Sequence, residues 1–77
     1  MIITYINMFD AEQKIVSKDG ELLATSTLDK LPDAIIKVLD EDNTVYIYSD
    51  LAGVDETLAK VLKQRKENII VRSIKNV

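Results

Sequence analysis

The sequence contains no cysteine, no histidine and no tryptophan among its 77 residues. Without a thiol or an imidazole, the chain cannot form a disulfide or a thiolate zinc site. It also lacks the pairing of a nucleophile with a histidine base on which serine-triad and papain-like enzymes depend. Carboxylates are therefore the side chains left for acid–base or metal chemistry.

Glycine, proline and long hydrophobic runs are also scarce. The chain has two glycines and one proline, and neither Gly20 nor Gly53 lies in a phosphate-binding or dinucleotide-binding pattern. No hydrophobic run approaches the roughly 20 residues of a membrane-spanning helix, and residues 1–5 lack the basic region of a secretory signal. There is no linker, repeat or low-complexity stretch. We therefore expect residues 1–77 to form one small soluble domain in the cytoplasm.

Charge is distributed unevenly along the chain. Residues 1–59 hold four lysines and twelve acidic residues, whereas residues 60–77 hold six lysines or arginines and one glutamate. The net charge of −3 thus combines an acidic body with a basic final segment. Leucine, isoleucine and valine together number 25, so the core must be aliphatic. A domain of this size is marginally stable by itself, which favours a surface for a partner or for self-association.

Three β-strands are predicted in the first third of the chain. Residues 2–9 are β-branched and aromatic with little polar alternation, which is typical of a central strand buried on both faces. Residues 13–18 and 21–26 flank the dipeptide Asp19-Gly20. Because this dipeptide tolerates positive φ at both central positions, it predicts a hairpin with a type I′ turn.

Two helices are predicted from apolar residues at helical spacing. The first runs from about Leu31 to Asp40, with Pro32 in its first turn, where a missing amide hydrogen is tolerated. The acidic residues 40–43 that follow are expected to form a solvated turn, because they are unfavourable at the negative end of the helix dipole. A second helix is expected to be capped by Asp55 and to stop near residue 68.

The remaining strands complete the predicted fold. Residues 45–48 read as a second buried strand, and residues 69–74 as a last strand rich in β-branched side chains. The order of elements is then β-β-β-α-β-α-β. With right-handed crossovers, this order predicts an α/β (two-layer α+β) fold with a five-stranded mixed sheet in the order 3-2-1-4-5. Both helices lie on one face of that sheet, and the other face is uncovered.

The end of the fourth predicted strand carries a local motif. Residues 45–50 read Val-Tyr-Ile-Tyr-Ser-Asp, and together with the order of elements they resemble the ribonuclease H-like family. The resemblance implies phosphodiester hydrolysis by two Mg²⁺ ions held by acidic residues, with Asp50 matching the carboxylate at this strand end. The family's Asp in the body of the first strand and its Glu in the first helix are missing here. Asp10 and Asp33 are the nearest substitutes.

Two interpretations of these carboxylates remain open. Asp10, Asp33 and Asp50 could form a metal site at the carboxyl ends of adjacent parallel strands. Alternatively, they are ordinary turn and helix-start carboxylates of an inactive relative. We expect no metal, no cofactor and no catalytic activity.

The aromatic residues fall on two adjacent predicted strands. Alternation places Val45 and Ile47 on one face of their strand and the tyrosines on the other. If the aliphatic residues face the helices, the uncovered sheet face collects Tyr5, Phe9, Tyr46 and Tyr48. Exposed surfaces of this kind are typical of protein interfaces. The alternative is a half-buried aromatic face without a partner.

The last helix carries a basic patch, formed by Lys60, Lys63, Arg65 and Lys66. Cations near a helix C-terminus are ordinary, and a site for nucleic acid or an acidic partner is the alternative. Single-stranded RNA could stack on an aromatic sheet face. However, that binding needs a positive track, and acidic residues surround these strands, so nucleic-acid binding is disfavoured.

These observations predict a small non-catalytic accessory or regulatory protein, of a kind common in phages and mobile elements. It would bind a protein partner or form a homodimer through the aromatic face or by pairing an edge strand. We expect no binding to a membrane. The alternative is a nucleic-acid-binding or metal-dependent nuclease-like protein of the ribonuclease H-like class.

Overall fold

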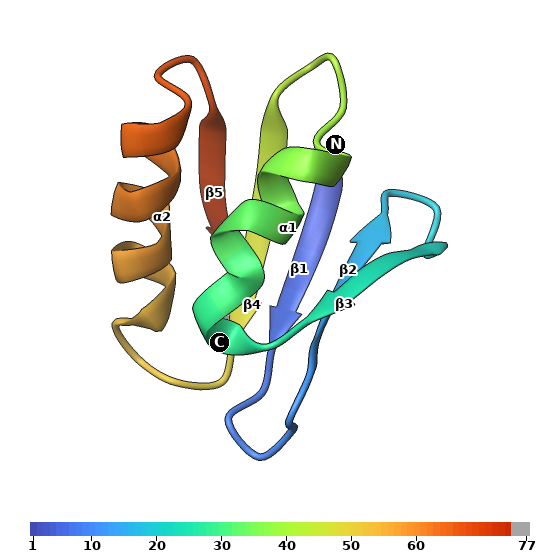
Figure 1. Cartoon of the computed structure of the whole chain (residues 1–77), viewed down its shortest axis with the longest axis vertical. Coiled ribbons are helices and arrows are strands. Elements are labelled where there is room, and N and C mark those ends of the chain that lie inside the picture. The colour runs from blue at the N-terminus through green and yellow to red at the C-terminus, as the bar shows by residue number, and fades with distance from the viewer. Residues whose placement is uncertain (75–77) are drawn as a thin grey trace.

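The secondary structure follows the alternation of apolar residues along the chain. A computed structural model describes residues 1–74, and its elements are coloured along the chain in Figure 1. The strands are β1 (Ile2–Ile6), β2 (Gln13–Ser17), β3 (Leu22–Ser26), β4 (Thr44–Ser49) and β5 (Ile70–Ile74). The helices are α1 (Leu31–Val38), preceded by the short 3₁₀ helix η1 (Leu28–Lys30), and α2 (Val54–Arg65).

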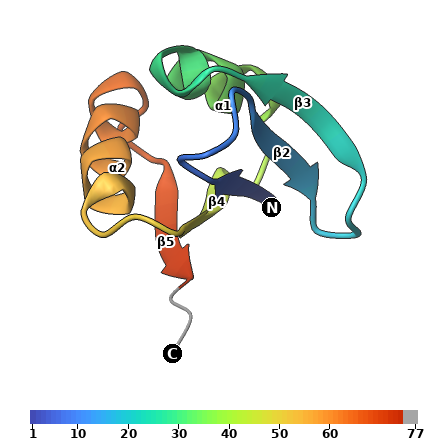
Figure 2. The same ribbon diagram turned by 90° about the horizontal axis from the view of Figure 1, so that it is seen from below.

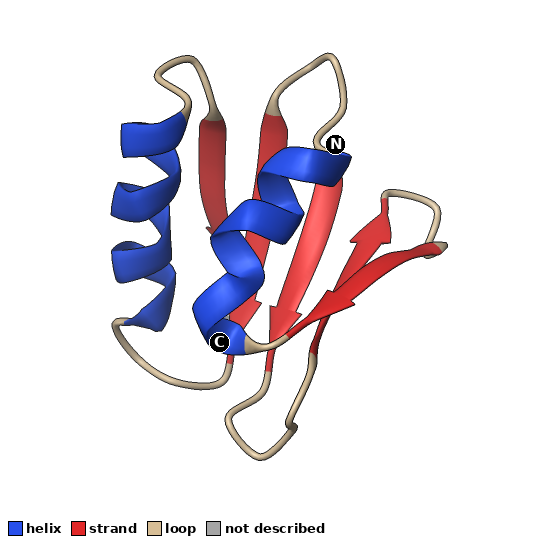
Figure 3. Ribbon diagram, in the orientation of Figure 1, coloured by secondary structure: helices blue, strands red, loops and turns tan. Residues whose placement is uncertain are grey.

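The strands form one mixed sheet in the order β3-β2-β1-β4-β5. β1 pairs antiparallel with β2 and parallel with β4, and β5 is parallel to β4. Figure 2 shows both helices on the same side of this sheet, and Figure 3 shows the helix α1, in blue, crossing in front of the strands, in red. The predicted α/β fold class, strand order and placement of the helices are confirmed. No helix among residues 1–74 is long and apolar enough to cross a membrane.

The core lies between the helices and the sheet. The strands and helices direct alternating or helically spaced aliphatic side chains into it, and the turn before β5 adds one more. The buried ones are Ile2, Ile6, Ile15, Leu31, Ile35, Val45, Ile47, Leu58, Leu62 and Ile69. Thr4 is also fully buried, and its hydroxyl donates a hydrogen bond to the Lys14 carbonyl oxygen at 3.3 Å. This polar group is therefore satisfied within the core.

β1 is shorter than predicted. It ends at Ile6, because Asn7 starts a turn in which its Oδ1 accepts the Phe9 N–H at 2.9 Å. The Asp10 N–H donates to the Asn7 carbonyl oxygen at 3.1 Å. Asparagine favours such turns by bonding to the backbone two residues on. The prediction that the strand is buried on both faces is also wrong, since Tyr5 is 43% exposed.

The hairpin between β2 and β3 is present, but its turn is not type I′. Only Gly20 of the central pair has a positive φ, of 89°. The Gly20 N–H donates to Ser17 O at 2.9 Å, and the Ser17 N–H donates to Glu21 O at 2.8 Å. These bonds close a three-residue loop with glycine in the left-handed position, the next commonest hairpin connection.

The helix boundaries differ from the prediction mainly in α2. α1 has Pro32 in its first turn as predicted. The N-cap of α2 is Gly53, with φ of 90°, so Asp55 lies in the first turn of the helix and is not its cap. α2 ends at Arg65, before the predicted residue 68, because Lys66 is extended and the Ile69 N–H closes a turn on the Lys66 carbonyl oxygen at 3.1 Å.

Candidate functional site

The side of the sheet opposite the helices is not covered by any element of residues 1–74 (Figure 2). We call this surface the open face. Strand register and alternation direct to it the side chains of Ile3, Tyr5, Lys14, Val16, Tyr46, Tyr48, Ile70, Arg72 and Ile74. Tyr5, Ile70 and Ile74 are each more than a third exposed. A group of exposed apolar side chains on one face is a feature of binding sites.

Three of the four aromatic residues expected at an interface share the open face. Tyr5 is the register partner of Tyr48, and Ile3 is the partner of Tyr46. The rings of Tyr5 and Tyr48 are tilted by 52°, with centroids 5.8 Å apart, a favourable geometry for an aromatic pair. Phe9 does not join them. It lies in the turn after β1 and is 94% exposed.

A hollow of about 420 Å³ lies at the carboxyl end of the open face. It is lined by the Tyr5–Tyr48 pair, by three acidic residues, and by Ile6, Asn7 and Lys14; the acidic residues are Asp10, Glu12 and Asp50. The Asp50 N–H donates to the Ile6 carbonyl oxygen at 3.2 Å, and Asp50 Oδ1 accepts the Met8 N–H at 3.4 Å. These bonds join the loop after β1 to the loop after β4.

The buried side chain of Gln13 supports the loop that carries Asp10 and Glu12. Sequence patterns did not identify this residue. Gln13 is 3% exposed, and its Oε1 accepts the Asn7 N–H at 2.7 Å. Its Nε2 donates to the carbonyl oxygens of Asn7 and Asp10 at 3.2 and 3.1 Å. A polar residue at an inward-facing strand position was the available signal, since such groups are buried only when they are hydrogen-bonded.

The three carboxylates considered for a metal site are not brought together. Asp10 and Asp50 line the same hollow, but Asp33 lies on α1, on the other side of the sheet (Figure 1). Asp33 forms an ion pair there with Arg65. Within residues 1–74, no group of three or more acidic, histidine or cysteine residues is placed to hold a metal ion.

The four basic residues of the last helix differ in their surroundings. Lys60 and Lys63 are exposed on α2, whereas Lys66 is half-buried at its C-cap. Arg65 pairs with Asp33 of α1. Because α2 covers the opposite side of the sheet from the tyrosines, these cations do not provide a positive track along the open face.

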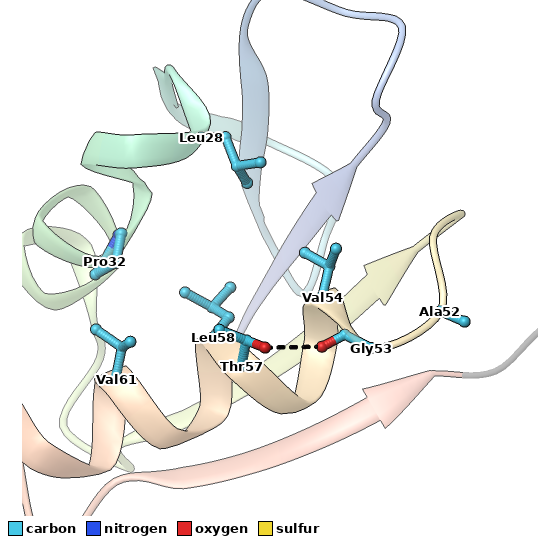
Figure 4. A pocket seen from close by; sticks show the side chains of 8 residues that line it. All are labelled: Leu28, Pro32, Ala52, Gly53, Val54, Thr57, Leu58 and Val61. Atoms are coloured by element: carbon cyan, nitrogen blue, oxygen red, sulfur yellow. Dashed lines mark hydrogen bonds between the residues drawn. The ribbon is translucent and has the colours of Figure 1, made fainter.

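A second concave surface lies between the start of α1 and the first turns of α2 (Figure 4). It encloses about 530 Å³ and is lined by Leu28, Pro32, Ala52, Gly53, Val54, Thr57, Leu58 and Val61. The Thr57 hydroxyl donates to the Gly53 carbonyl oxygen at 3.1 Å, so it is engaged within α2. The groove is apolar, and sequence patterns did not indicate it, because it depends on how two distant helices approach each other.

Comparisons of the chain with protein-family models, curated proteins and solved structures find no match. The function is therefore inferred from the geometry of the open face and its surroundings.

Proposed function

We propose that this domain is a non-catalytic accessory or regulatory protein of the cytoplasm that binds another protein through the open face. The observation that carries the proposal is the gathering of Tyr5, Tyr46 and Tyr48 on a sheet face that no helix of residues 1–74 covers. Tyrosine offers a large apolar area together with a polar tip, and it is enriched in interfaces for that reason. Covering this face would also stabilise a domain of marginal size.

Pairing along an edge strand is a second route to the same function. The edges of the sheet are β3 and β5. The β2–β3 pairing contains an irregularity between Ile15 and Val16, and bulges of this kind turn an edge away from new partners. β5 is regular and largely exposed, so it is the edge on which an added strand fits better.

A partner-capture experiment tests the proposal. The wild-type domain, Tyr46→Asp and Lys60→Asp serve as baits in extract from the native host, with captured proteins identified by mass spectrometry. We expect Tyr46→Asp to lose a partner that the wild type and Lys60→Asp both retain, because a carboxylate on the open face must be desolvated on binding. Sedimentation of the same proteins detects a homodimer.

If the wild type sediments as a monomer at high concentration, and all three baits capture the same proteins while remaining folded by circular dichroism, the proposal is wrong.

The ribonuclease H-like alternative depends on the strand order and on Tyr48-Ser49-Asp50. Its supporting feature is that Asp10 and Asp50 line one hollow. Titration with Mn²⁺ or Mg²⁺ to millimolar concentration decides it. A metal site would raise the melting temperature and perturb the amide signals of both residues, and unchanged values would exclude it.

A further inference from the structure

The charged groups around the open face differ between its centre and its carboxyl end. Among the strand residues on the face, two are charged: Lys14 on β2 and Arg72 on β5, which flank the tyrosines on opposite sides. At the carboxyl end, three carboxylates line one hollow with a single lysine. The middle of the face is therefore apolar, and its carboxyl end is negative.

The carboxyl-end hollow combines the two features that attract an organic cation. Tyr5 and Tyr48 line the hollow, and the face of a tyrosine ring attracts a Lys ammonium or an Arg guanidinium electrostatically. Asp10, Glu12 and Asp50 supply oxygens for charge-assisted hydrogen bonds. Asp50 Oδ1 accepts a long bond of 3.4 Å from the Met8 N–H, and an ionised carboxylate keeps lone pairs for further donors.

The dimensions of the open face match one short helix. Strands of five to six residues span about 17 Å at roughly 3.3 Å per residue, which equals about 11 residues of α-helix. A helix about 10 Å across would cover β1 and β4, the central strands that carry Ile3 and the three tyrosines. Lys14 and Arg72 would then lie beside its polar flanks, as in any layer of helix on sheet.

We propose that the open face binds a basic amphipathic helix of a partner protein. The apolar stripe of that helix covers Ile3, Tyr46 and Tyr48, and a Lys or Arg in its end turn enters the carboxyl-end hollow. This inference deepens the proposed function and rests on it, because it names the kind of partner that the open face takes.

A second copy of the chain fits the open face less well. Stacking two open faces with aligned strands places each acidic carboxyl end over an acidic region of the other copy. The amino end of the sheet has its own hollow, where the carboxylates of Asp19, Asp40, Glu41 and Asp42 outnumber Lys18 and the Met1 ammonium group. Like charges that face each other oppose association. The outward side of α2 offers Lys60 and Lys63 but no apolar stripe.

Three matched peptides test the proposal. Each has about 16 residues and the same leucine stripe at helical spacing, with Arg, Gln or Glu in the end turns. Fluorescence anisotropy gives the affinities, and NMR chemical shifts locate the binding site. We expect the Arg peptide to bind about tenfold more tightly than the Gln peptide and the Glu peptide to bind most weakly. Raising the salt from about 0.05 to 0.5 M should remove most of the difference.

Variants of the domain assign the effect to the hollow. The double variant Glu12→Gln, Asp50→Asn should weaken the Arg peptide several-fold and leave the Gln peptide unchanged. The matched control Glu21→Gln, Glu67→Gln removes the same charge from two exposed positions outside the hollow and should behave as the wild type. Tyr48→Ala should weaken the Arg and Gln peptides together.

Each remaining outcome overturns the inference. Equal affinities for the three peptides, a preference for the Glu peptide, or no binding at all would show that the partner is not a basic helix. If the wild type instead dimerises through the open face and Tyr46→Asp abolishes the dimer, the occupant is a second copy. Because the capture experiment uses no designed peptide, its result can still support the proposed function when the peptides fail.

Discussion

At the scale of single residues, Gln13 connects the core to the carboxyl-end hollow. Its amide is buried, and it pairs with three backbone groups of the loop between β1 and β2. That loop carries Asp10 and Glu12. The position of two hollow carboxylates is therefore fixed by a side chain that does not line the hollow itself.

Replacing Gln13 by leucine should destabilise the domain. The change preserves approximate size but leaves backbone groups of Asn7 and Asp10 without their partner, at a cost of about 1–3 kcal/mol in the free energy of unfolding. Urea denaturation measures this loss. The neighbouring variant Lys14→Met, at an exposed strand position, should change stability by less than about 0.5 kcal/mol. Equal effects of the two variants would contradict the role assigned to Gln13.

At the scale of elements, α1 and α2 are connected by two kinds of contact. Leu62 of α2 is fully buried in the core, whereas the ion pair between Arg65 and Asp33 has side chains 45% and 69% exposed. Water and salt screen an exposed pair, so it contributes at most about 1 kcal/mol. Burial of aliphatic side chains holds the helices to the sheet.

Variants at these positions should separate the two contributions. Leu62→Ala should lower the free energy of unfolding by about 2–5 kcal/mol, because it removes buried methyl groups and leaves a cavity. Asp33→Asn should lower it by less than about 1 kcal/mol. Chemical denaturation of both proteins gives the comparison, with the half-buried Val61→Ala expected between them. A larger loss for Asp33→Asn than for Leu62→Ala would refute this ranking.

At the scale of the whole molecule, acidic groups gather at both ends of the sheet. At the amino end, the Met1 ammonium group lies 2.6 Å from Asp40 Oδ2 and 2.8 Å from Asp42 Oδ2. The hydrogen bonds that the ammonium group donates, first to Asp40 and then to Asp42, raise its pKa above its ordinary 8.0. The ammonium group and the Thr44 N–H lower the pKa of Asp42 below its ordinary 3.8.

The contribution of this cluster to stability should depend on pH. The raised ammonium pKa stabilises the fold fully below pH 8.0, and this is lost as the pH rises through the folded-state value. The lowered Asp42 pKa stabilises it above pH 3.8, and this is lost as the pH falls through the folded-state value. For protein with Met1 as its first residue, the wild type should have a higher melting temperature than the Asp42→Asn variant near neutral pH. The difference should shrink in acid and alkali.

Thermal melts followed by circular dichroism measure this difference. Glu67→Gln, an exposed substitution after α2, controls for the loss of one negative charge. A difference between wild type and Asp42→Asn that stays constant across the pH range would contradict the assigned pairing.

Much of the fold was predictable because the relevant signals are local. The alternation of Val45 to Tyr48 determined which side chains face the helices, and that assignment agrees with the buried and half-buried positions of β4. Asp19-Gly20 located the hairpin, although a single positive φ at Gly20 was enough to close it. The strand order followed from the sequence of elements and the handedness of crossovers.

The candidate site was predictable in part. Tyr5, Tyr46 and Tyr48 share a face because strand periodicity extends over β1 and β4. Phe9 was misplaced because the Asn7 side chain bonds to the backbone and ends β1 at Ile6. Strand propensity over residues 2–9 did not reveal this competition between a side chain and the sheet.

The sequence by itself determined the classes of chemistry open to this protein, its alternating strands and its order of elements, since composition and periodicity express these directly. Only the tertiary structure decided which charges meet. It paired Asp33 with Arg65 on the helical side and left Asp10, Glu12 and Asp50 around the tyrosines on the open face. The physical reason is that such contacts depend on distances between segments far apart in the chain, which no local pattern encodes.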